Sequence, residues 1–266
     1  MHLERYIPPT AHPLHPFVQS LFFARSAHAR ELVLPKCNVD LLFNLGDPVR
    51  VEVVARPAAV LMWTRSLVAG LQTGALLSKP QGSIAIFGIS LKAATCRAVL
   101  PLPLCEITDR VVDGALVSPD LDRVWGWLGE DLRFSRQCRL VLDWLASRLS
   151  PPAQADLVHG ACRLLDAFPD GRCIDAVLQA SAVSPRHLRR LFQHHVGVGP
   201  AQYLRLSRFN KALHLMNSPL SLTEIALEAL YFDQAHFCRD FKETTGMSPG
   251  QYRREAGLAP GHVFYP

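Results

Sequence analysis

The sequence predicts an α+β protein with a strand-rich N-terminal domain, residues 1–150, and an all-α C-terminal domain, residues 151–266. Three observations support this class. Short apolar runs bounded by turn residues occupy the first half, and helical spacing with clear capping residues occupies the second half. Two adjacent prolines, Pro151 and Pro152, separate the halves. A chain of 266 residues with 49% apolar side chains is long enough for two such domains.

The N-terminal domain is expected to be a small barrel or sheet closed by a helical pair. Asn38–Asn44 and Val49–Val54 are predicted strands on either side of the turn Gly46-Asp47-Pro48. Ser83–Ile89 is a third short apolar run bounded by glycine. Apolar residues recur at helical spacing over Leu121–Leu149, which predicts the closing helices.

Seven short helices are predicted after the prolines, and their ends carry capping residues. Ser184-Pro185 and Ser248-Pro249 place a hydroxyl before a proline at the first helical position, and Gly197 and Gly246 stand where helices should end. The predicted helices are Leu157–Phe168, Ile174–Ala182, Ser184–His195, Pro200–Asn217, Leu222–Leu230, Asp233–Thr245 and Ser248–Glu255.

The helical domain contains an internal repeat at an offset of 49 residues. Leu188, Arg190, Phe192, Gly197, Pro200 and Tyr203 correspond to Phe237, Arg239, Phe241, Gly246, Pro249 and Tyr252. Such a period indicates a duplicated supersecondary unit. Each unit reads as a short helix, a tight turn and an amphipathic second helix, which is the pattern of a helix-turn-helix whose second helix can enter the DNA major groove.

Charge is distributed as DNA binding requires. No acidic residue lies between Asp175 and Glu224, whereas six basic residues lie in that segment: Arg186, Arg189, Arg190, Arg205, Arg208 and Lys211. Basic side chains without acidic neighbours neutralise phosphates and release counterions. A helix over Pro200–Asn217 would span about 27 Å, so second helices tethered at its two ends could reach successive major grooves, about 34 Å apart.

The sequence argues against several other classes of protein. It contains no Walker loop, GxGxxG, HExxH or GxSxG motif, so we expect no enzyme and no cofactor. His12 and His15 are three residues apart, but Pro13 between them prevents a helix that would place both on one face to bind a metal, so we expect no metal site. The seven cysteines are scattered singly and are expected to be reduced. No apolar stretch suits a membrane span and residues 1–9 lack a signal pattern, which favours the cytoplasm.

The C-terminal half resembles the DNA-binding domain of AraC/XylS-type transcriptional regulators over about 100 residues. The motifs that carry the resemblance are Leu188–Phe192, Gly197–Tyr203, Leu222–Ala226, Asp233–Lys242 and Thr245–Arg253. Residues 1–150 resemble more loosely an N-terminal domain found on some of these regulators. The family usually has glycine in each helix-turn-helix turn, where this chain carries Ala182 and Leu230. Glycine adopts positive φ without strain, whereas leucine would either adopt it at an energetic cost or force a slightly different turn in the second unit.

The resemblance and the chemistry of the side chains together predict the DNA contacts. Arginine can bridge guanine O6 and N7, glutamine suits adenine and alanine suits a thymine methyl. The expected base contacts are Arg186, Arg189, Arg190, Gln234, Ala235 and Arg239. The expected phosphate contacts are Ser184, His187, His236 and Arg205. For Arg190 and Arg239 the alternative is a salt bridge to a neighbouring helix.

The expected function is sequence-specific transcription regulation with double-stranded DNA as the partner. The resemblance implies that residues 1–150 bind an effector or dimerise, and it makes RNA polymerase a further candidate partner. Trp125, Trp127 and Trp144 would either form an apolar dimer seam or pack against the sheet. The alternative function is a helical ligand-binding or dimerising protein that does not bind DNA.

Overall fold

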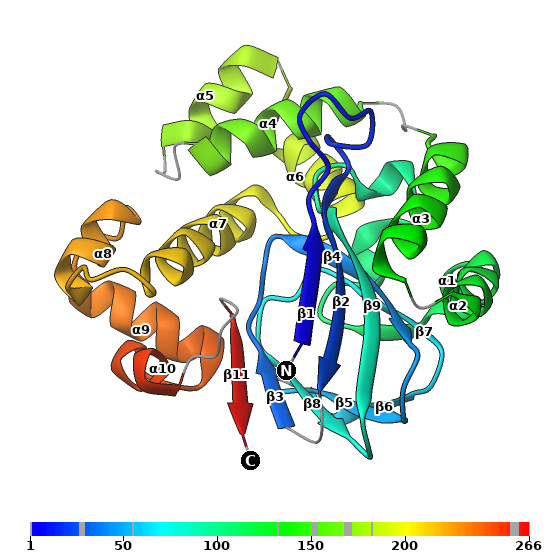
Figure 1. Ribbon diagram of the computed structural model, residues 1–266. Coiled ribbons are helices and arrows are strands. Elements are labelled where there is room, and N and C mark those ends of the chain that lie inside the picture. The colour runs from blue at the N-terminus through cyan, green and yellow to red at the C-terminus, as the bar shows by residue number, and fades with distance from the viewer. Residues whose placement is uncertain are drawn as a thin grey trace.

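The computed structural model describes residues 2–26, 30–54, 56–131, 133–150, 154–167, 172–181, 183–255 and 261–265. Figure 1 shows a strand-rich part, which ends in the helices α2 and α3, beside a helical part that begins at α4. The predicted division into a strand-rich half and a helical half is confirmed at this level.

The strand-rich part contains two antiparallel sheets. Sheet A has the strand order β1-β2-β9-β4-β7-β10 and sheet B the order β11-β3-β8-β5-β6. The strands of sheet A are β1 (His2–Tyr6), β2 (Val18–Ser26), β9 (Ile84–Lys92), β4 (Asn38–Asn44), β7 (Ser66–Ala69) and β10 (Val111–Asp113). Those of sheet B are β11 (His262–Tyr265), β3 (Arg30–Val33), β8 (Leu76–Pro80), β5 (Val49–Val53) and β6 (Arg56–Trp63).

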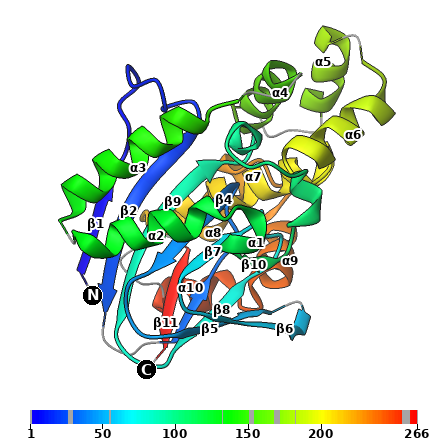
Figure 2. The ribbon, with the colours of Figure 1, turned by 90° about the vertical axis from the view of Figure 1, so that its right-hand side faces the viewer.

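Helices cover one face of sheet A, as Figure 2 shows for α2 (Asp120–Glu130) and α3 (Phe134–Arg148). Alternate residues of β4, Val39, Leu41 and Phe43, are fully buried in the core on this face. Leu42, between them, packs instead with Val49 and Trp63 in the core that includes sheet B. Because successive side chains of β4 point to opposite faces, this strand contributes to two cores, one on each face of sheet A.

The predicted strands over Asn38–Asn44 and Val49–Val54 are present as β4 and β5, but they are not partners. β4 pairs with β7 and β9 in sheet A, whereas β5 pairs with β6 and β8 in sheet B. The turn between them therefore carries the chain from one sheet to the other. Asn44 fixes this turn, because its Nδ2 donates to the Asp47 carbonyl at 2.8 Å and its Oδ1 accepts from the Gly46 amide at 3.0 Å.

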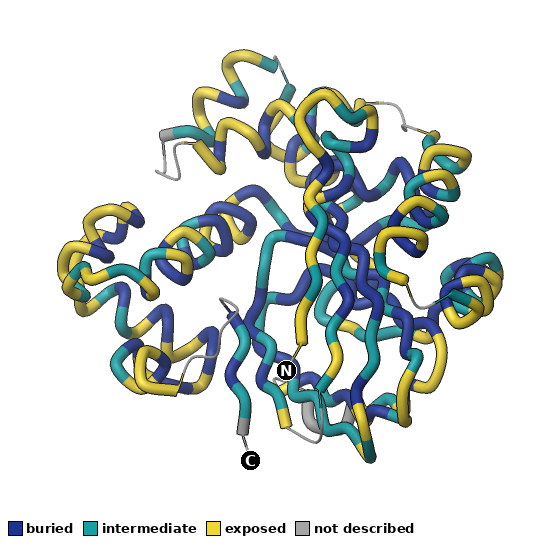
Figure 3. The backbone as a smooth tube through the Cα atoms, viewed as in Figure 1, coloured by how far each residue is buried: buried dark blue, intermediate teal, exposed yellow. Residues whose placement is uncertain are grey.

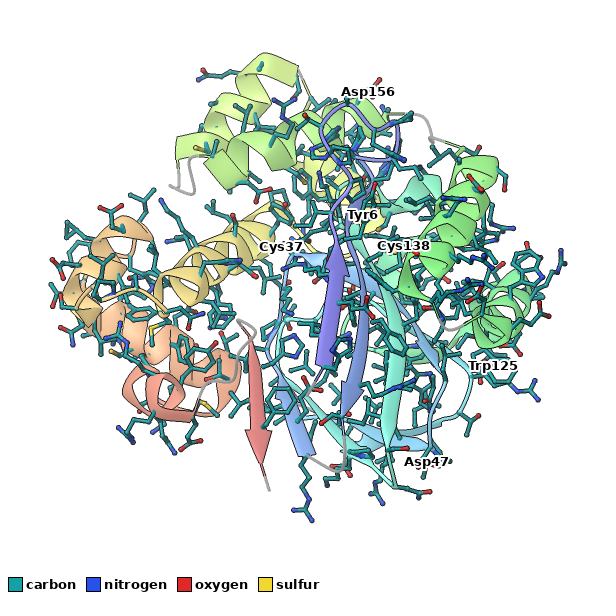
Figure 4. The ribbon with its side chains drawn as sticks, viewed as in Figure 1. Tyr6, Cys37, Asp47, Trp125, Cys138 and Asp156 are labelled. Atoms are coloured by element: carbon teal, nitrogen blue, oxygen red, sulfur yellow. The ribbon has the colours of Figure 1, made fainter. Side chains whose placement is uncertain are left out.

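Two of the three tryptophans near α2 and α3 pack against the core below them. Trp125 donates from Nε1 to the Asn44 carbonyl at 2.5 Å, and Figure 4 marks its position on α2. Trp144 packs against the same core, with the guanidinium of Arg148 over its ring. Trp127 is exposed. For Trp125 and Trp144 the packing alternative therefore holds.

All seven predicted helices of the second half are present, with ends that differ by two residues or fewer. They are α4 (Ala155–Ala167), α5 (Arg172–Ser181), α6 (Pro185–His195), α7 (Pro200–Leu215), α8 (Leu222–Glu228), α9 (Gln234–Thr245) and α10 (Pro249–Glu255). Their outer faces are exposed and their inner faces buried (Figure 3). Three further short helices precede α2: η1 (Cys96–Ala98), η2 (Leu104–Glu106) and α1 (Gly114–Val117).

The expectation that no strand follows residue 151 is wrong. β11 (His262–Tyr265) leaves the helical domain and pairs antiparallel with β3 at the edge of sheet B. Figure 1 shows β11 between α10 and β3. Four residues are too few for a periodic signal, and the partner strand lies at the other end of the sequence.

In the part of the chain described here, no helix has both the length and the apolar character needed to cross a bilayer.

Candidate nucleic-acid interface

The first helix-turn-helix unit consists of α5 and α6. Ser184 caps α6, because its Oγ accepts from the His187 amide at 3.2 Å, and Pro185 occupies the first turn. Leu188, Leu191 and Phe192 face the core. The opposite face of α6 exposes three guanidinium groups, those of Arg186, Arg189 and Arg190.

The second unit consists of α8 and α9. Ser221 and Glu224 form a capping box on α8, since each side chain accepts the other residue's backbone N–H. Asp233 caps α9 by accepting from the His236 amide at 2.6 Å. Gln234, Ala235 and Arg239 are exposed on α9.

The repeat in the sequence corresponds to a repeat in the structure. Leu188 and Phe237 are buried at the same place in α6 and α9, and Gly197 and Gly246 both adopt positive φ after these helices, at 100° and 79°. Pro200 and Pro249 begin α7 and α10. Tyr203 and Tyr252, Phe192 and Phe241, and Arg190 and Arg239 complete the equivalent pairs. The two units are therefore copies of one design, connected by α7.

Arg190 and Arg239 hold equivalent, exposed positions. Within the described ranges, no carboxylate lies within ion-pair distance of either guanidinium. The same is true of Arg186 and Arg189 among the residues whose positions are given. The salt-bridge alternative for Arg190 and Arg239 thus finds no partner in this part of the molecule, and both side chains are free to contact another molecule.

The residues predicted to contact phosphate are in varied surroundings. Ser184 is exposed beside the N-terminus of α6 and His236 is half-buried beside that of α9, where backbone amides favour an anion. The half-buried His187 lies in the first turn of α6. Arg205, on α7, donates from Nη2 to Glu243 at 2.8 Å and from Nε to Asp240, so it joins α7 to α9. Two carboxylates would compete there with a phosphate.

The turn of the second unit contains a leucine in left-handed conformation. Leu230 has φ of 61° between α8 and α9, a region that suits glycine. Leu230 thus adopts the left-handed conformation at a cost in backbone energy. Ala182, named above as the residue in the turn of the first unit, lies outside the described residues.

Two features of the interface were missed in the sequence. Thr223 on α8 donates from Oγ1 to Gln234 Oε1 at 2.7 Å, which orients the amide at the start of α9. Phe232, directly before the α9 cap, is 90% exposed. The separation of eleven residues between Thr223 and Gln234 matches no sequence motif, so the sequence did not indicate this contact. Phe232 lies beside a predicted turn, and its aromatic character could have been noted from the sequence.

His195, the last residue of α6, is buried. Its side chain is 3% exposed, although it follows His194 at the end of a helix whose other face is exposed. Burial lowers the pKa of its imidazole to about 4, helped by the nearby charges of His194 and Arg97. The residue belongs to the contact between α6 and the strand-rich part, where Thr108 Oγ1 also donates to the Gly197 carbonyl at 2.9 Å.

Two family models match parts of the chain. A model described as a helix-turn-helix domain matches residues 177–255, which include α6 to α10. A model described as a domain of unknown function, DUF6597, matches residues 5–113 in the strand-rich part.

Several transcriptional regulators are similar to the helical half. The regulator MtrA of Neisseria gonorrhoeae is 35% identical over 102 residues, and the regulator GlxA of Rhizobium meliloti is 41% identical over 83 residues. The activator RhaS of Salmonella arizonae is 35% identical over 98 residues. These alignments cover 31–38% of this chain and only 26–35% of the relatives, so they concern one domain.

The solved structures of ToxT from Vibrio cholerae share the fold of both halves. ToxT bound to an unsaturated fatty acid matches with a TM-score of 0.53 and 9% sequence identity, over 87% of this chain and 94% of ToxT. A second crystal form of ToxT gives a TM-score of 0.52 and 10% identity. Because only 9–10% of the residues are identical, this similarity shows a shared fold and nothing further.

Proposed function

Because residues 177–255 form a helix-turn-helix domain of the AraC type, we propose that this chain is a sequence-specific DNA-binding transcription regulator that reads two successive major grooves. The observation that carries the proposal is the pair of equivalent helices, α6 and α9, each with an exposed arginine at the same place. α7 has 16 residues and connects the two units over about 24 Å. Major grooves on one face of a duplex repeat every 34 Å or so.

We divide these side chains into those that would contact DNA bases and those that would contact the DNA phosphates. Arg186, Arg189, Arg190, Gln234, Ala235 and Arg239 are the proposed base contacts. Ser184, His187, His236 and Arg205 are the proposed phosphate contacts. Arg205 would have to exchange Glu243 or Asp240 for phosphate to take this role.

The strand-rich half is proposed to regulate the DNA-binding half. We divide the chain at residues 150 and 151, and we assign effector binding or homodimer formation to residues 1–150. ToxT, which shares the fold, has been solved with an unsaturated fatty acid bound, and this supports a small-molecule effector here. RNA polymerase is a further proposed partner. The protein would act in the cytoplasm and would have no catalytic activity.

DNA binding by the full chain is the first prediction. Several phosphate contacts should make the logarithm of the binding constant fall linearly with the logarithm of salt concentration, with a slope of about 0.9 per contact. Fluorescence anisotropy on labelled duplexes between low and moderate salt measures this slope. A flat response would reject the electrostatic argument and favour a helical protein that binds ligands or dimerises without DNA.

Separate base readout by the two units is the second prediction. Arg190→Ala and Arg239→Ala should each weaken the specific site by about 1–3 kcal/mol and relax preference at one base pair. The two base pairs should lie about one helical turn apart. Selection of binding sites from random duplexes with each variant measures both effects.

His236→Ala serves as the comparison, because a phosphate contact carries no sequence information. It should weaken all duplexes alike. If Arg239→Ala left both affinity and base preference unchanged, the second unit would be structural, and recognition would depend on the first unit alone.

A further inference from the structure

Two side chains of the second helix-turn-helix unit contact each other at its proposed DNA-binding surface. α8 and α9 lie next to each other at the end of α7 (Figure 1). Thr223, in the first turn of α8, donates from Oγ1 to Oε1 of Gln234, the first residue of α9, at 2.7 Å. Both side chains are exposed, and Gln234 is one of the proposed base contacts. The contact therefore bears on which base Gln234 can read.

Local structure fixes the positions of both partners. Ser221 caps α8 and the neighbouring Leu222 packs against the core, which leaves Thr223 on the outer face. The χ1 angle of a β-branched side chain is restricted, so the Thr223 hydroxyl has few alternative positions. In the turn between the helices, the Tyr231 hydroxyl donates to Asp240 of α9 at 2.7 Å. The start of α9 is thereby held at a fixed place beside α8.

The nitrogen end of the Gln234 amide faces the next turn of α9. Burial raises the pKa of the Cys238 thiol, and the Gln234 side chain, one turn earlier, opposes this rise. A neutral amide stabilises a thiolate only by donating a hydrogen bond, so Nε2 is the end that lies on this side. The amide is therefore oriented, with its oxygen toward α8 and its nitrogen toward the following turn of α9.

The first unit has different residues at the two equivalent positions. At the offset of 49 residues, Thr223 corresponds to Ile174 and Gln234 corresponds to Pro185. Ile174 packs against the core around α4 and α6, and the side chain of Pro185 has no polar atom. The oriented amide is therefore a feature of the second unit, whereas the first unit exposes arginines in its place.

An amide with a fixed orientation can distinguish adenine from guanine. In the major groove adenine offers a donor at N6 and an acceptor at N7, whereas guanine offers acceptors at O6 and N7. Gln234 Oε1 has two lone pairs, of which Thr223 uses one, so one acceptor position and the N–H groups of Nε2 remain for adenine. Guanine would place its O6 against Oε1. To remove that repulsion the amide must turn over and lose the hydrogen bond from Thr223.

We propose that Thr223 is a positioning residue that makes Gln234 selective for adenine over guanine in the major groove that α9 enters. This selectivity, which rests on the proposed DNA-binding function, concerns one base pair of the target site. A glutamine amide without the threonine can turn over at little cost and would accept either purine. The hydrogen bond is exposed to water in the free protein, and it strengthens once DNA covers the surface and excludes water.

Selection of binding sites from random duplexes by the full chain tests the role of Thr223. Thr223→Val keeps the shape of the side chain and removes the hydroxyl. A good pair of hydrogen bonds discriminates between bases by about fivefold or more, so the valine variant should lose at least about fivefold of the preference for adenine over guanine at one base pair. Preference at the base pairs assigned to Arg190 and Arg239 should not change. Thr223→Ser restores the hydroxyl and should restore most of the preference.

Gln234→Ala identifies the base pair that the amide reads, because this variant should lose preference at that pair. Adding Thr223→Val to Gln234→Ala should have no further effect there, since Thr223 acts through the amide. Thr64→Val, at an exposed residue of the strand-rich half, is the matched control and should select the same sites as the unmodified chain.

The orientation of the amide is also measurable without DNA. Nuclear magnetic resonance relaxation gives an order parameter for Gln234 Nε2, and this should be lower in Thr223→Val than in the unmodified chain. Thermal unfolding of the two proteins should be the same, because Thr223 is exposed and its replacement leaves the core unchanged.

Three results would overturn the proposal. Thr223→Val could weaken all duplexes alike, which would make Thr223 a phosphate contact, or it could leave the base preference unchanged, or its effect could persist beside Gln234→Ala. Each of these results, obtained with an unmodified chain that selects a defined site, leaves the proposed DNA-binding function standing. An unmodified chain that selects no sequence would instead reject that function and the selectivity together.

Discussion

His195 shows how one buried side chain makes the contact between the halves sensitive to acid. Its imidazole is 3% exposed and Nδ1 has no hydrogen-bond partner within the described parts of the chain. Burial lowers its pKa to about 4, against about 6.5 for histidine in an unfolded chain. Protonation would place a charge in an apolar contact near Arg97, so the folded state favours the neutral ring.

The free energy of unfolding should therefore depend on pH in a defined window. Because the folded-state pKa is lowered, the unfolded chain binds more protons between about pH 6.5 and pH 4. The contribution of His195 is complete above pH 6.5 and is lost as the pH falls toward 4, by about 3 kcal/mol at 1.36 kcal/mol per pKa unit. Denaturant unfolding of His195→Leu across this range should show a flatter profile.

His214→Leu provides the comparison, since His214 is exposed on α7. Its pH profile should follow that of the unmodified chain. If His195→Leu lost stability with acid as steeply as the control does, burial of His195 would not be the cause.

Leu230 is a residue whose replacement should stabilise the protein. Its φ of 61° costs leucine about 1 kcal/mol relative to glycine, and its side chain is 43% exposed, so little packing is lost on removal. Leu230→Gly should raise the free energy of unfolding by about 1 kcal/mol in denaturant titrations, with Leu230→Asn in between. A lower stability for the glycine variant would mean that the side chain packs more than its exposure suggests.

At the scale of elements, local signals predicted the helices well and the strands poorly. Caps such as Ser184-Pro185 and the glycines after α6 and α9 act within a few residues, so the sequence alone places the helix ends. Strand partners are set by contacts between distant segments. The turn at Gly46-Asp47-Pro48 correctly predicted a break between two strands but could not show that β4 and β5 belong to different sheets.

In the candidate site, too, features set by local sequence were predictable and features set by contacts between distant segments were not. The exposed arginines on α6 and α9 were predictable from periodicity and from the repeat, because both are local patterns. The partners of Arg205, the contact between Thr223 and Gln234 and the burial of His195 depend on how helices pack, and periodicity does not specify packing. A cleft between the two halves, lined by Lys36, Lys92 and Lys211 among others, exists only when both halves are in place.

β11 should contribute measurably to stability despite its length. Val263 is fully buried in a core that also contains Leu34, Phe209 and Tyr252. Val263→Ala removes two methyl groups and should lower the free energy of unfolding by about 2 kcal/mol. Hydrogen exchange should rise at β3 amides as pairing weakens.

The same substitution at Val60 is the control, because Val60 lies on β6 at the opposite edge of sheet B and is 43% exposed. Val60→Ala should change stability by less than about 0.5 kcal/mol. Equal effects at the two positions would contradict a role for β11 in holding the sheet edge.

At the scale of the whole molecule, two of the hydrophobic cores contain residues from both sides of residue 150. Leu32, Leu34 and Ala75 of the strand-rich half belong to the core around α7 and α9. Leu71, Ala93 and Ala94 belong to the core around α4 and α6. The two halves therefore share buried surface as well as a covalent link.

Cutting the chain between residues 150 and 154 should therefore leave the halves associated. With a protease site inserted there, the cleaved protein should elute as one species in native size exclusion and as two fragments in denaturant. A cleaved form carrying Val263→Asp tests the role of β11 and should separate more readily. Fragments that part at once in native buffer and remain folded would instead support two independent domains.

The place of β11 in the chain also bears on the order in which the protein folds. β11 joins β3 through residue pairs that are 229 (His262 and Val33) to 235 (Tyr265 and Arg30) apart in sequence, and all seven helices of the second half are synthesised between them. During translation β3 therefore presents an open edge to solvent, and unpaired strand edges attract other chains. Closing so long a loop is entropically costly unless the helices have already folded and shortened it. Sheet B is thus completed only after the helical half has formed, which makes its last strand a late and slow step of folding.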